Sequence, residues 1–156
     1  MTTTLSTQAA ENGKATTVKK TFSRETTVST SIKASPTAIW TLLTTAANFP
    51  KWNSTIISIE GNIKLGETIK LKSTLDPKRT FKLKIKEFEA NKKLVWGDGN
   101  GNRIYTLNDN GNGTVTFTMT EKIGGAMFPM YSKYIPPFDQ SFEQFAADLK
   151  KKAESN

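Results

Sequence analysis

Residues 67–89 read ETIKLKSTLDPKRTFKLKIKEFE, and their alternation indicates the class of fold. Apolar side chains recur at every second position on each side of the Asp76-Pro77 turn, at Ile69, Leu71, Phe81, Leu83 and Ile85. Because successive side chains of a strand point to opposite faces, this pattern predicts a β-hairpin with one buried face. The opposite face, which we call the lysine face, carries Lys70, Lys72, Lys82, Lys84 and Lys86. We interpret it as the solvated outside of a sheet, with an anionic surface partner as the alternative.

Further strands are expected on both sides of this hairpin. Gly, Asn and Asp separate short alternating segments from residue 56 onward, which predicts an antiparallel meander. The segments are Ile56–Glu60, Glu67–Thr74, Arg79–Glu89, Leu94–Gly97, Arg103–Asn108 and Thr114–Ile123. With Thr26–Lys33 as an earlier strand, the sheet has about seven strands. Phe88 departs from the alternation, so a bulge near Lys86–Glu87 is predicted, which would bend the sheet.

Helices are predicted after the first strand and at the end of the chain. Ser35-Pro36 has the form of an N-cap followed by the first residue of a short helix. A second short helical piece is expected over Ala46–Lys51, stopped at Phe49-Pro50. An apolar face with a period of about 3.6 residues predicts a long final helix, at Phe138, Phe142, Phe145, Ala146 and Leu149. Pro136-Pro137 predicts a break or kink there. The fold class is therefore α+β.

Composition excludes several classes of function. The chain has no cysteine and no histidine, which excludes disulfides, thiol nucleophiles, imidazole catalysis and thiolate metal sites, and we expect no metal or cofactor. No apolar run could span a bilayer and no secretory signal is visible, so a cytoplasmic location is expected. The net charge is +8, but no nucleic-acid recognition motif accompanies it, so nucleic acid is not an expected partner. Residues 1–20 are expected to form a flexible tail before a single domain over residues 21–156.

The last predicted strand places a carboxylate among apolar residues. One parity of this strand holds Val115, Phe117, Met119, Glu121 and Ile123. An inward carboxylate is costly unless it is paired or hydrated. The preceding turn should bring Arg103 opposite Met119 and diagonal to Glu121, so we predict an Arg103–Glu121 ion pair. The alternative is that Glu121 lies at a rim and meets water.

Several short segments of the chain follow one another in an order that is typical of one superfamily. They are Ala34-Ser35-Pro36 ahead of Ile39-Trp40, Pro50-Lys51-Trp52-Asn53, Gly66, Leu94-Val95-Trp96 and Thr120-Glu121-Lys122-Ile123-Gly124. From about Thr26 to the C-terminus the chain resembles the polyketide cyclase/dehydrase and lipid-transport branch of the START-related, birch-pollen-allergen-like (SRPBCC) superfamily. It departs from that family at Thr44-Thr45, where an acidic residue is common.

The resemblance implies a helix-grip fold, in which a curved antiparallel sheet wraps around the C-terminal helix and encloses a cavity. It also implies a ligand, because members bind or transform lipids, sterols, polyketides and similar apolar molecules. Related domains include cochaperones that activate the Hsp90 ATPase.

Aromatic and methionine side chains cluster where that cavity is expected. The segment Gly125–Ile135 is too apolar for an ordinary loop and suits a lid over a ligand, although it could equally plug the cavity as core. The predicted ligand-binding residues are Trp52, Phe81, Leu83, Trp96, Tyr105, Phe117, Met119, Glu121, Met127, Phe128, Tyr131, Tyr134 and Phe142. Candidates for catalysis are Glu121 as a general base, with Arg103 or Tyr105 as the donor.

These features leave three hypotheses for function. The first is binding or carriage of a hydrophobic small molecule between the sheet and the final helix. The second is a metal-free enzyme of the cyclase/dehydratase kind that uses Glu121. The third is a cochaperone-like module that binds an acidic protein through the lysine face, and a homodimer is left open.

Overall fold

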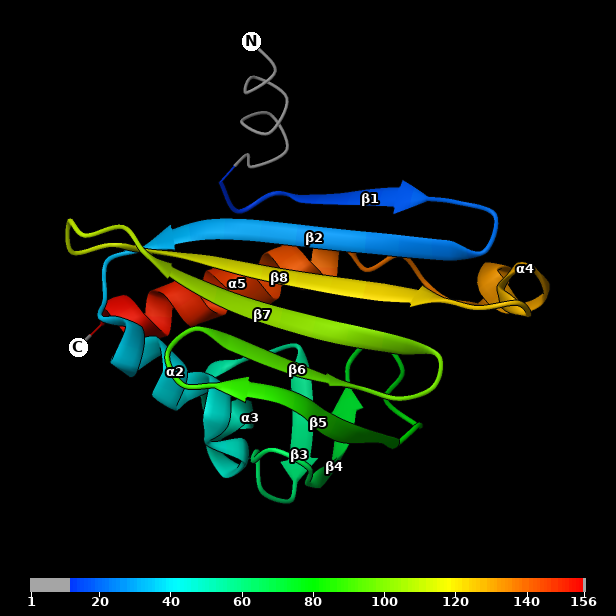
Figure 1. The fold of residues 1–156 in the computed structure, drawn as a ribbon, viewed down its shortest axis with the longest axis horizontal. Helices are drawn as coiled ribbons and strands as arrows, with labels where there is room; N and C mark the ends of the chain where they lie inside the picture. The colour runs from blue at the N-terminus through cyan, green and yellow to red at the C-terminus, as the bar shows by residue number, and fades with distance from the viewer. Residues whose placement is uncertain (1–11, 156) are drawn as a thin grey trace, which may run out of the picture.

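An eight-stranded antiparallel sheet curves around the C-terminal helix in the computed structural model, which describes residues 12–155 (Figure 1). The strands are β1 (Ala15–Lys19), β2 (Ser23–Ile32), β3 (Ile56–Glu60), β4 (Thr68–Ser73), β5 (Phe81–Glu89), β6 (Lys93–Gly97), β7 (Gly101–Asp109) and β8 (Val115–Gly124). Their order across the sheet is β1-β2-β8-β7-β6-β5-β4-β3, so the meander from β3 to β8 closes onto β2. The predicted α+β fold is confirmed.

Helical segments occupy the concave side and one end of this sheet. They are α2 (Pro36–Thr44), η1 (Ala46–Asn48), α3 (Phe49–Trp52), α4 (Phe128–Tyr131), η2 (Ser132–Tyr134) and α5 (Asp139–Glu154). Ser35 caps α2 as predicted, because its hydroxyl accepts a hydrogen bond from the amide of Ala38. No helix among residues 12–155 has the length and apolar character needed to cross a membrane.

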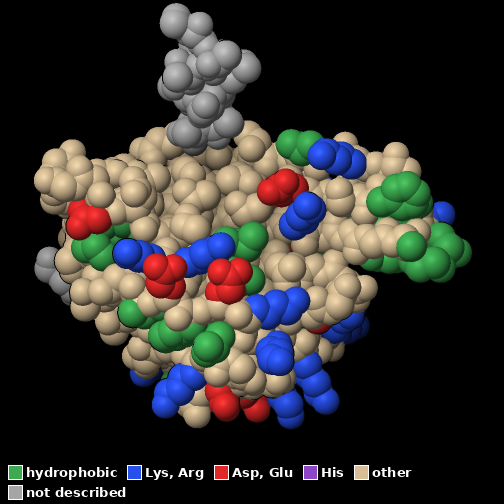
Figure 2. All heavy atoms as spheres, viewed as in Figure 1, with side chains coloured by type: hydrophobic (Ala, Val, Ile, Leu, Met, Phe, Trp, Pro, Cys, Tyr) green, Lys and Arg blue, Asp and Glu red, His purple; other side chains and the backbone are tan. Residues whose placement is uncertain are grey.

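The curvature of the sheet has a local cause that the sequence indicates. The register between β5 and β6 shifts between Ile85 and Glu87, which confirms the bulge predicted near Lys86–Glu87. The lysine face lies on the outside, where all its members except the half-buried Lys72 are exposed. Lys and Arg side chains accordingly gather in the lower right part of Figure 2, near the region of β4 and β5 in Figure 1.

The predicted flexible tail is wrong for Ala15–Lys19, which form the edge strand β1. Side chains of α5 hold this strand by hydrogen bonds that a local sequence pattern does not reveal. The amide of Ala15 donates to Glu143 over 2.9 Å, and the hydroxyl of Thr17 donates to Asp139 over 2.7 Å. The rest of the tail prediction concerns residues 1–11, outside the described part of the chain, and the single-domain boundary stays a prediction.

The structure corrects one of the two expectations about proline and confirms the other. Phe49-Pro50 does not end a helix: α3 begins at Phe49, and Pro50 lies in its first turn, where a missing amide proton breaks no helical hydrogen bond. Pro136-Pro137 interrupts the helical path as predicted, because η2 ends at Tyr134 and α5 begins only at Asp139, after both prolines. The apolar segment before them forms the separate turns α4 and η2.

The core between α5 and the sheet is filled by aromatic rings around Phe145. Its ring stacks on Phe117 of β8 with 6.2 Å between the ring centres, and it lies 5.8 Å from Tyr105 of β7. On the other side it lies 6.2 Å from Phe49 and 6.0 Å from Trp52, both of α3. One helical residue therefore joins the sheet and the short helix α3 into one packed layer.

This cluster predicts a large loss of stability for Phe145→Ala. Removal of a buried Phe side chain leaves a cavity and should lower the free energy of unfolding by about 3–5 kcal/mol. Leu65→Ala is the matched control, since the side chain of Leu65 is 64% exposed and its loss should cost less than about 0.5 kcal/mol. Denaturant unfolding of the two variants measures both values, and similar losses would contradict the central role of Phe145.

Candidate functional site

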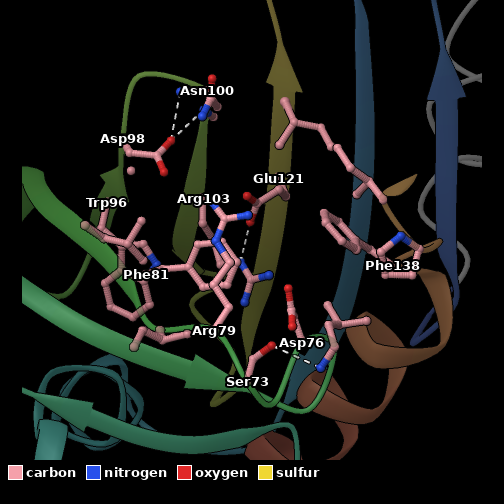
Figure 3. A pocket seen from close by; sticks show the side chains of 18 of the residues that line it. Ser73, Asp76, Arg79, Phe81, Trp96, Asp98, Asn100, Arg103, Glu121 and Phe138 are labelled. Atoms are coloured by element: carbon pink, nitrogen blue, oxygen red, sulfur yellow. Dashed lines mark hydrogen bonds and ion pairs between the residues drawn. The ribbon is translucent and has the colours of Figure 1, made fainter. Parts of the chain in front are cut away.

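A cavity of about 450 Å³ opens at the end of the sheet where α5 begins. Its sheet wall comes from β4, β5, β6, β7 and β8, and the segment before α5 forms the opposite wall (Figure 3). The lining residues are Leu71, Ser73, Leu75, Asp76, Arg79, Phe81, Leu83, Trp96, Gly97, Asp98, Asn100, Gly101, Arg103, Glu121, Ile123, Tyr131, Tyr134, Ile135, Pro136 and Phe138. Most of these side chains are apolar, with charged groups placed among them.

The sheet wall follows from strand parity. Leu71 of β4, Phe81 and Leu83 of β5 and Trp96 of β6 all belong to the concave face. Leu71 is directly opposite Phe81 in the register, so their side chains lie side by side. Phe81 and Leu83 are only half-buried, whereas Ile85 further along the same strand is fully buried. The concave face therefore changes from closed core to open cavity along β5.

An ion pair between Arg103 and Glu121 forms the polar part of the wall. Nε of Arg103 donates to Oε1 of Glu121 over 2.7 Å, and the two side chains are only 14% and 18% exposed. The guanidinium also lies 4.9 Å from the centre of the Phe142 ring, a cation–π contact that holds it against α5. No hydrogen bond within residues 12–155 uses Oε2 of Glu121, so that oxygen remains available to a ligand.

The predicted pair is thus confirmed, but its predicted register is wrong. Arg103 is directly opposite Glu121, and Tyr105 is the residue opposite Met119. The difference of two residues arises in the turn between β7 and β8, where Asp109 still pairs with Val115 and the tip spans five residues.

Burial and charge set the protonation behaviour of this pair. Burial raises the pKa of Glu121 above its ordinary value, and the neighbouring Arg103 offsets only part of this effect. Burial is the largest single influence on Arg103 and would lower its pKa, but the neighbouring Glu121 and Tyr105 together outweigh burial and the pKa is raised. The wall therefore holds a permanently charged guanidinium next to a carboxylate whose charged form is disfavoured by its surroundings.

Tyr105, the other catalytic candidate, lies behind the wall. Its side chain is fully buried, packs edge-on against Trp96 with 5.0 Å between ring centres, and does not line the cavity. The hydroxyl has no hydrogen-bond partner within residues 12–155, although Arg103 is close enough to influence it electrostatically. Burial raises the pKa of Tyr105, which keeps the hydroxyl protonated.

The mouth of the cavity carries charged groups that sequence reasoning missed. The guanidinium of Arg79 lies 4.5 Å from the centre of the Phe81 ring, so it covers the edge of the apolar wall. Asp76 of the turn between β4 and β5 also lines the mouth, and Figure 3 shows it near Arg79. At the opposite end, Oδ1 of Asp98 accepts hydrogen bonds from the amides of Asn100 and Gly101, at 2.8 and 3.1 Å. Parity does not predict Asp76 and Asp98, because they belong to turns, whereas Arg79 shares the parity of Phe81 in the predicted strand Arg79–Glu89.

Arg24 of β2 positions the segment that forms the far wall. Its guanidinium donates to the carbonyl of Pro136 over 2.8 Å and to that of Ile135 over 3.3 Å. It also lies 4.6 Å from the centre of the Phe138 ring. Burial lowers the pKa of this guanidinium, while Asp139 and Glu121 act in the opposite direction. Arg24 shares its parity with Thr26 and Val28, so an earlier start of the predicted strand would have revealed it.

The structure brings some of the predicted ligand-binding residues to the cavity and places others elsewhere. Those at the cavity are Phe81, Leu83, Trp96, Glu121, Tyr131 and Tyr134. Those packed in the aromatic core or beneath it are Trp52, Tyr105, Phe117, Met119 and Phe142. Of the remaining two, Met127 is exposed on the surface and Phe128 is buried against Tyr131. The space beneath the middle of α5 is therefore filled, and the void lies near its first turn. Among residues 12–155, no cluster of acidic side chains has the arrangement of a metal site.

The fold is similar to that of several solved structures. A protein from Rhodobacter sphaeroides matches with a TM-score of 0.65 and 15% identity, over 92% of this chain and 99% of that one. A START superfamily protein from Mycobacterium smegmatis matches with a TM-score of 0.61 and 12% identity, over 84% and 97% of the two chains. DynU16, described as a putative protein in the dynemicin biosynthetic locus, matches with a TM-score of 0.62 and 16% identity, over 83% of this chain and 46% of that one.

At these identities the structural likeness concerns the fold alone, and no curated protein matches the chain in sequence. A match to a known family is more direct evidence of relationship. Residues 33–153 match the family described as Activator of Hsp90 ATPase homolog 1-like protein, which covers most of the chain from the end of β2 to the last turn of α5. The chain therefore belongs to this family, within the SRPBCC superfamily that its sequence resembles.

Proposed function

We propose that the protein binds an amphipathic small molecule, with the apolar part of the ligand in the cavity and a polar group at Arg103 and Glu121. The observation that carries this proposal is the cavity itself. Its volume of about 450 Å³ falls within the range of about 300–1,000 Å³ that is usual for small-molecule sites. An apolar lining with a few convergent polar groups is the usual character of such sites.

The charged groups in the wall favour a ligand with at least one hydrogen-bonding group. Oε2 of Glu121 would accept a hydrogen bond from a ligand hydroxyl, and Arg79 at the mouth would attract a ligand carboxylate or phosphate. A purely apolar ligand would leave these groups without partners and with less water, which costs free energy. A lipid or polyketide with an oxygen-bearing end therefore suits the site better than a plain hydrocarbon.

A second candidate function is catalysis by Glu121. The specific observation in its favour is a carboxyl group in a cavity wall whose pKa is raised by burial, as a general acid or base requires. The strong contact with Arg103 opposes this role, because a carboxylate already bound to a guanidinium is a weaker base. We therefore favour binding, with Glu121 as an orienting group.

A variant that fills the cavity tests the binding proposal. Leu83→Trp adds bulk to the half-buried sheet wall, and it should weaken binding of the apolar dye anilinonaphthalene sulfonate at least about tenfold, equivalent to about 1.4 kcal/mol. Leu65→Trp makes the same change at an exposed position outside the cavity and should leave dye affinity unchanged. Dye fluorescence titration gives both affinities, and native mass spectrometry of the purified protein identifies any ligand that it retains. Equal dye affinity in both variants would count against the cavity as the binding site.

The role of Glu121 is tested by Glu121→Gln. This variant keeps the shape and one acceptor oxygen, so binding of a ligand found by mass spectrometry should persist within a few-fold. If the ligand is instead a substrate, the same variant should bind it without converting it. Persistence of turnover in Glu121→Gln would exclude Glu121 as the catalytic group.

A double-mutant cycle measures the strength of the Arg103–Glu121 pair. Arg103→Met and Glu121→Gln should each destabilise the protein, and their coupling energy should be about 1–3 kcal/mol because water screens this pair poorly. The exposed pair Lys93–Glu87 has 3.2 Å between its charged atoms and side chains that are 39% and 55% exposed, so it is the matched control. Its coupling energy should stay below about 1 kcal/mol. Equal coupling in the two cycles would show that the buried pair has no special strength.

A further inference from the structure

Exposed apolar side chains gather at the end of the molecule formed by α4 and the turn between β1 and β2. Among residues 12–155, seven large hydrophobic side chains are strongly exposed, and four of them lie here. They are Phe22 (57% exposed), Met127 (58%), Met130 (67%) and Tyr134 (75%), and we call them the apolar tip. Figure 2 shows hydrophobic side chains at its right-hand end, where Figure 1 places α4 and that turn.

The two parts of the tip are joined through the backbone. The amide of Gly125 donates to the carbonyl of Phe22 over 2.9 Å, and Ser23 pairs with Gly124 at the ends of β2 and β8. The exposed side chains therefore belong to one surface rather than to independent loops. A cluster of exposed Met, Phe and Tyr side chains of this kind marks an interaction site, since such groups are otherwise withdrawn from water.

Lysine residues flank the apolar tip. Lys19 and Lys20 lead into the turn that carries Phe22, Lys122 lies near the end of β8, and Lys133 follows Met130; all four are exposed. The exposed acidic residue in these strands is Glu25, which is opposite Lys122 in the register. Four lysines against one carboxylate leave a clear positive excess around the apolar side chains. Nζ of Lys133 lies 5.2 Å from the centre of the Tyr134 ring, so its charge stays close to the tip.

We propose that the apolar tip docks on the surface of an anionic phospholipid bilayer. Apolar side chains that enter the interface between headgroups and acyl chains, with lysines reaching the phosphates around them, are the arrangement that such a surface requires. Charge favours this occupant over a protein, because lysine is depleted in protein–protein interfaces whereas an anionic membrane attracts it.

Docking at this tip would place the cavity beside the membrane. Tyr134 belongs to the tip and also lines the cavity, and its neighbours Tyr131, Ile135 and Pro136 form the adjoining wall. The same segment thus has one side toward the cavity and another toward the bilayer. The link between membrane docking and a ligand in the cavity rests on the proposed function. The proposal that the apolar tip docks on a membrane does not.

Sedimentation with lipid vesicles tests the proposal on the whole protein. Vesicles of phosphatidylcholine with phosphatidylserine should bind it, vesicles of phosphatidylcholine alone should bind it far less, and added salt should weaken binding. Met127→Ser with Met130→Ser should reduce the vesicle partition coefficient at least about tenfold, since two apolar side chains no longer enter the interface. Leu65→Ser, at a side chain 64% exposed but outside the tip, should leave it unchanged.

A charge-matched pair of variants separates docking at the tip from general attraction of a basic protein. Lys19→Glu with Lys133→Glu should weaken binding more than about tenfold, since each lysine near an anionic surface changes the partition about fivefold. Lys82→Glu with Lys84→Glu changes the net charge equally on the lysine face and should have a smaller effect. All the substituted side chains are exposed, and circular dichroism verifies that the variants are folded.

Three results would overturn the proposal. The first is no binding to phosphatidylserine vesicles at low salt, and the second is an equal loss of vesicle binding in the tip variants and their controls. The third is self-association of the protein, measured by light scattering, that is lost in the methionine variant. The last would identify the tip as an interface between two copies of the chain. Absence of dye binding to the cavity of the unaltered protein, together with intact vesicle binding, would refute the proposed ligand function and leave membrane docking in place.

Discussion

The packing of Phe145 between α5, the sheet and α3 is the interaction on which the rest of the structure depends. A curved sheet around a single helix leaves space on its concave side, and that space can be filled by side chains or left for a ligand. Here the rings of Phe117, Tyr105 and Phe49 close around Phe145 and fill the middle of this space. The void is consequently displaced to the first turn of α5, where the helix no longer covers the whole sheet.

Two arginines, the buried Arg24 and the largely buried Arg103, then determine the character of that open end. Arg103 brings a carboxylate into the wall as an ion pair, which is tolerated because each charge has a close partner of opposite sign. Arg24 makes its hydrogen bonds to backbone carbonyls instead, and it thereby fixes the proline-containing segment as the far wall of the cavity. Both guanidiniums also lie against aromatic rings, Phe142 and Phe138, so the polar groups and the aromatic core support one another.

The segment between β8 and α5 lies between the cavity and the exposed end of the molecule. Its prolines and short turns prevent it from joining the final helix, so it lies across the end of the sheet as an independent wall. Tyr131 and Tyr134 line the cavity, while Met127 and Met130 remain in water. Methionine and tyrosine side chains tolerate such partly hydrated positions, because each combines an adaptable apolar surface with a polar or polarisable atom.

Much of this architecture could be predicted from local patterns. Alternation in the strands, Gly and Asn in the turns, the departure at Phe88 and the apolar face of the final helix specified the meander, the bulge and the sheet face that covers α5. These features depend on neighbours within a few residues, so the sequence alone determined them. The ion pair between Arg103 and Glu121 was also predictable, because parity places both residues on the concave face.

Only the tertiary structure decided where the cavity lies and which residues reach it. Parity gives Phe117 and Leu83 the same direction. Phe117 is nevertheless closed in the core, because Phe145 of α5 stacks on it, whereas Leu83 lines the void. The strand formed by Ala15–Lys19 likewise depends on hydrogen bonds to Glu143 and Asp139, more than a hundred residues away. Contacts between distant segments carry no local signature, which is why they became visible only once the chain was folded.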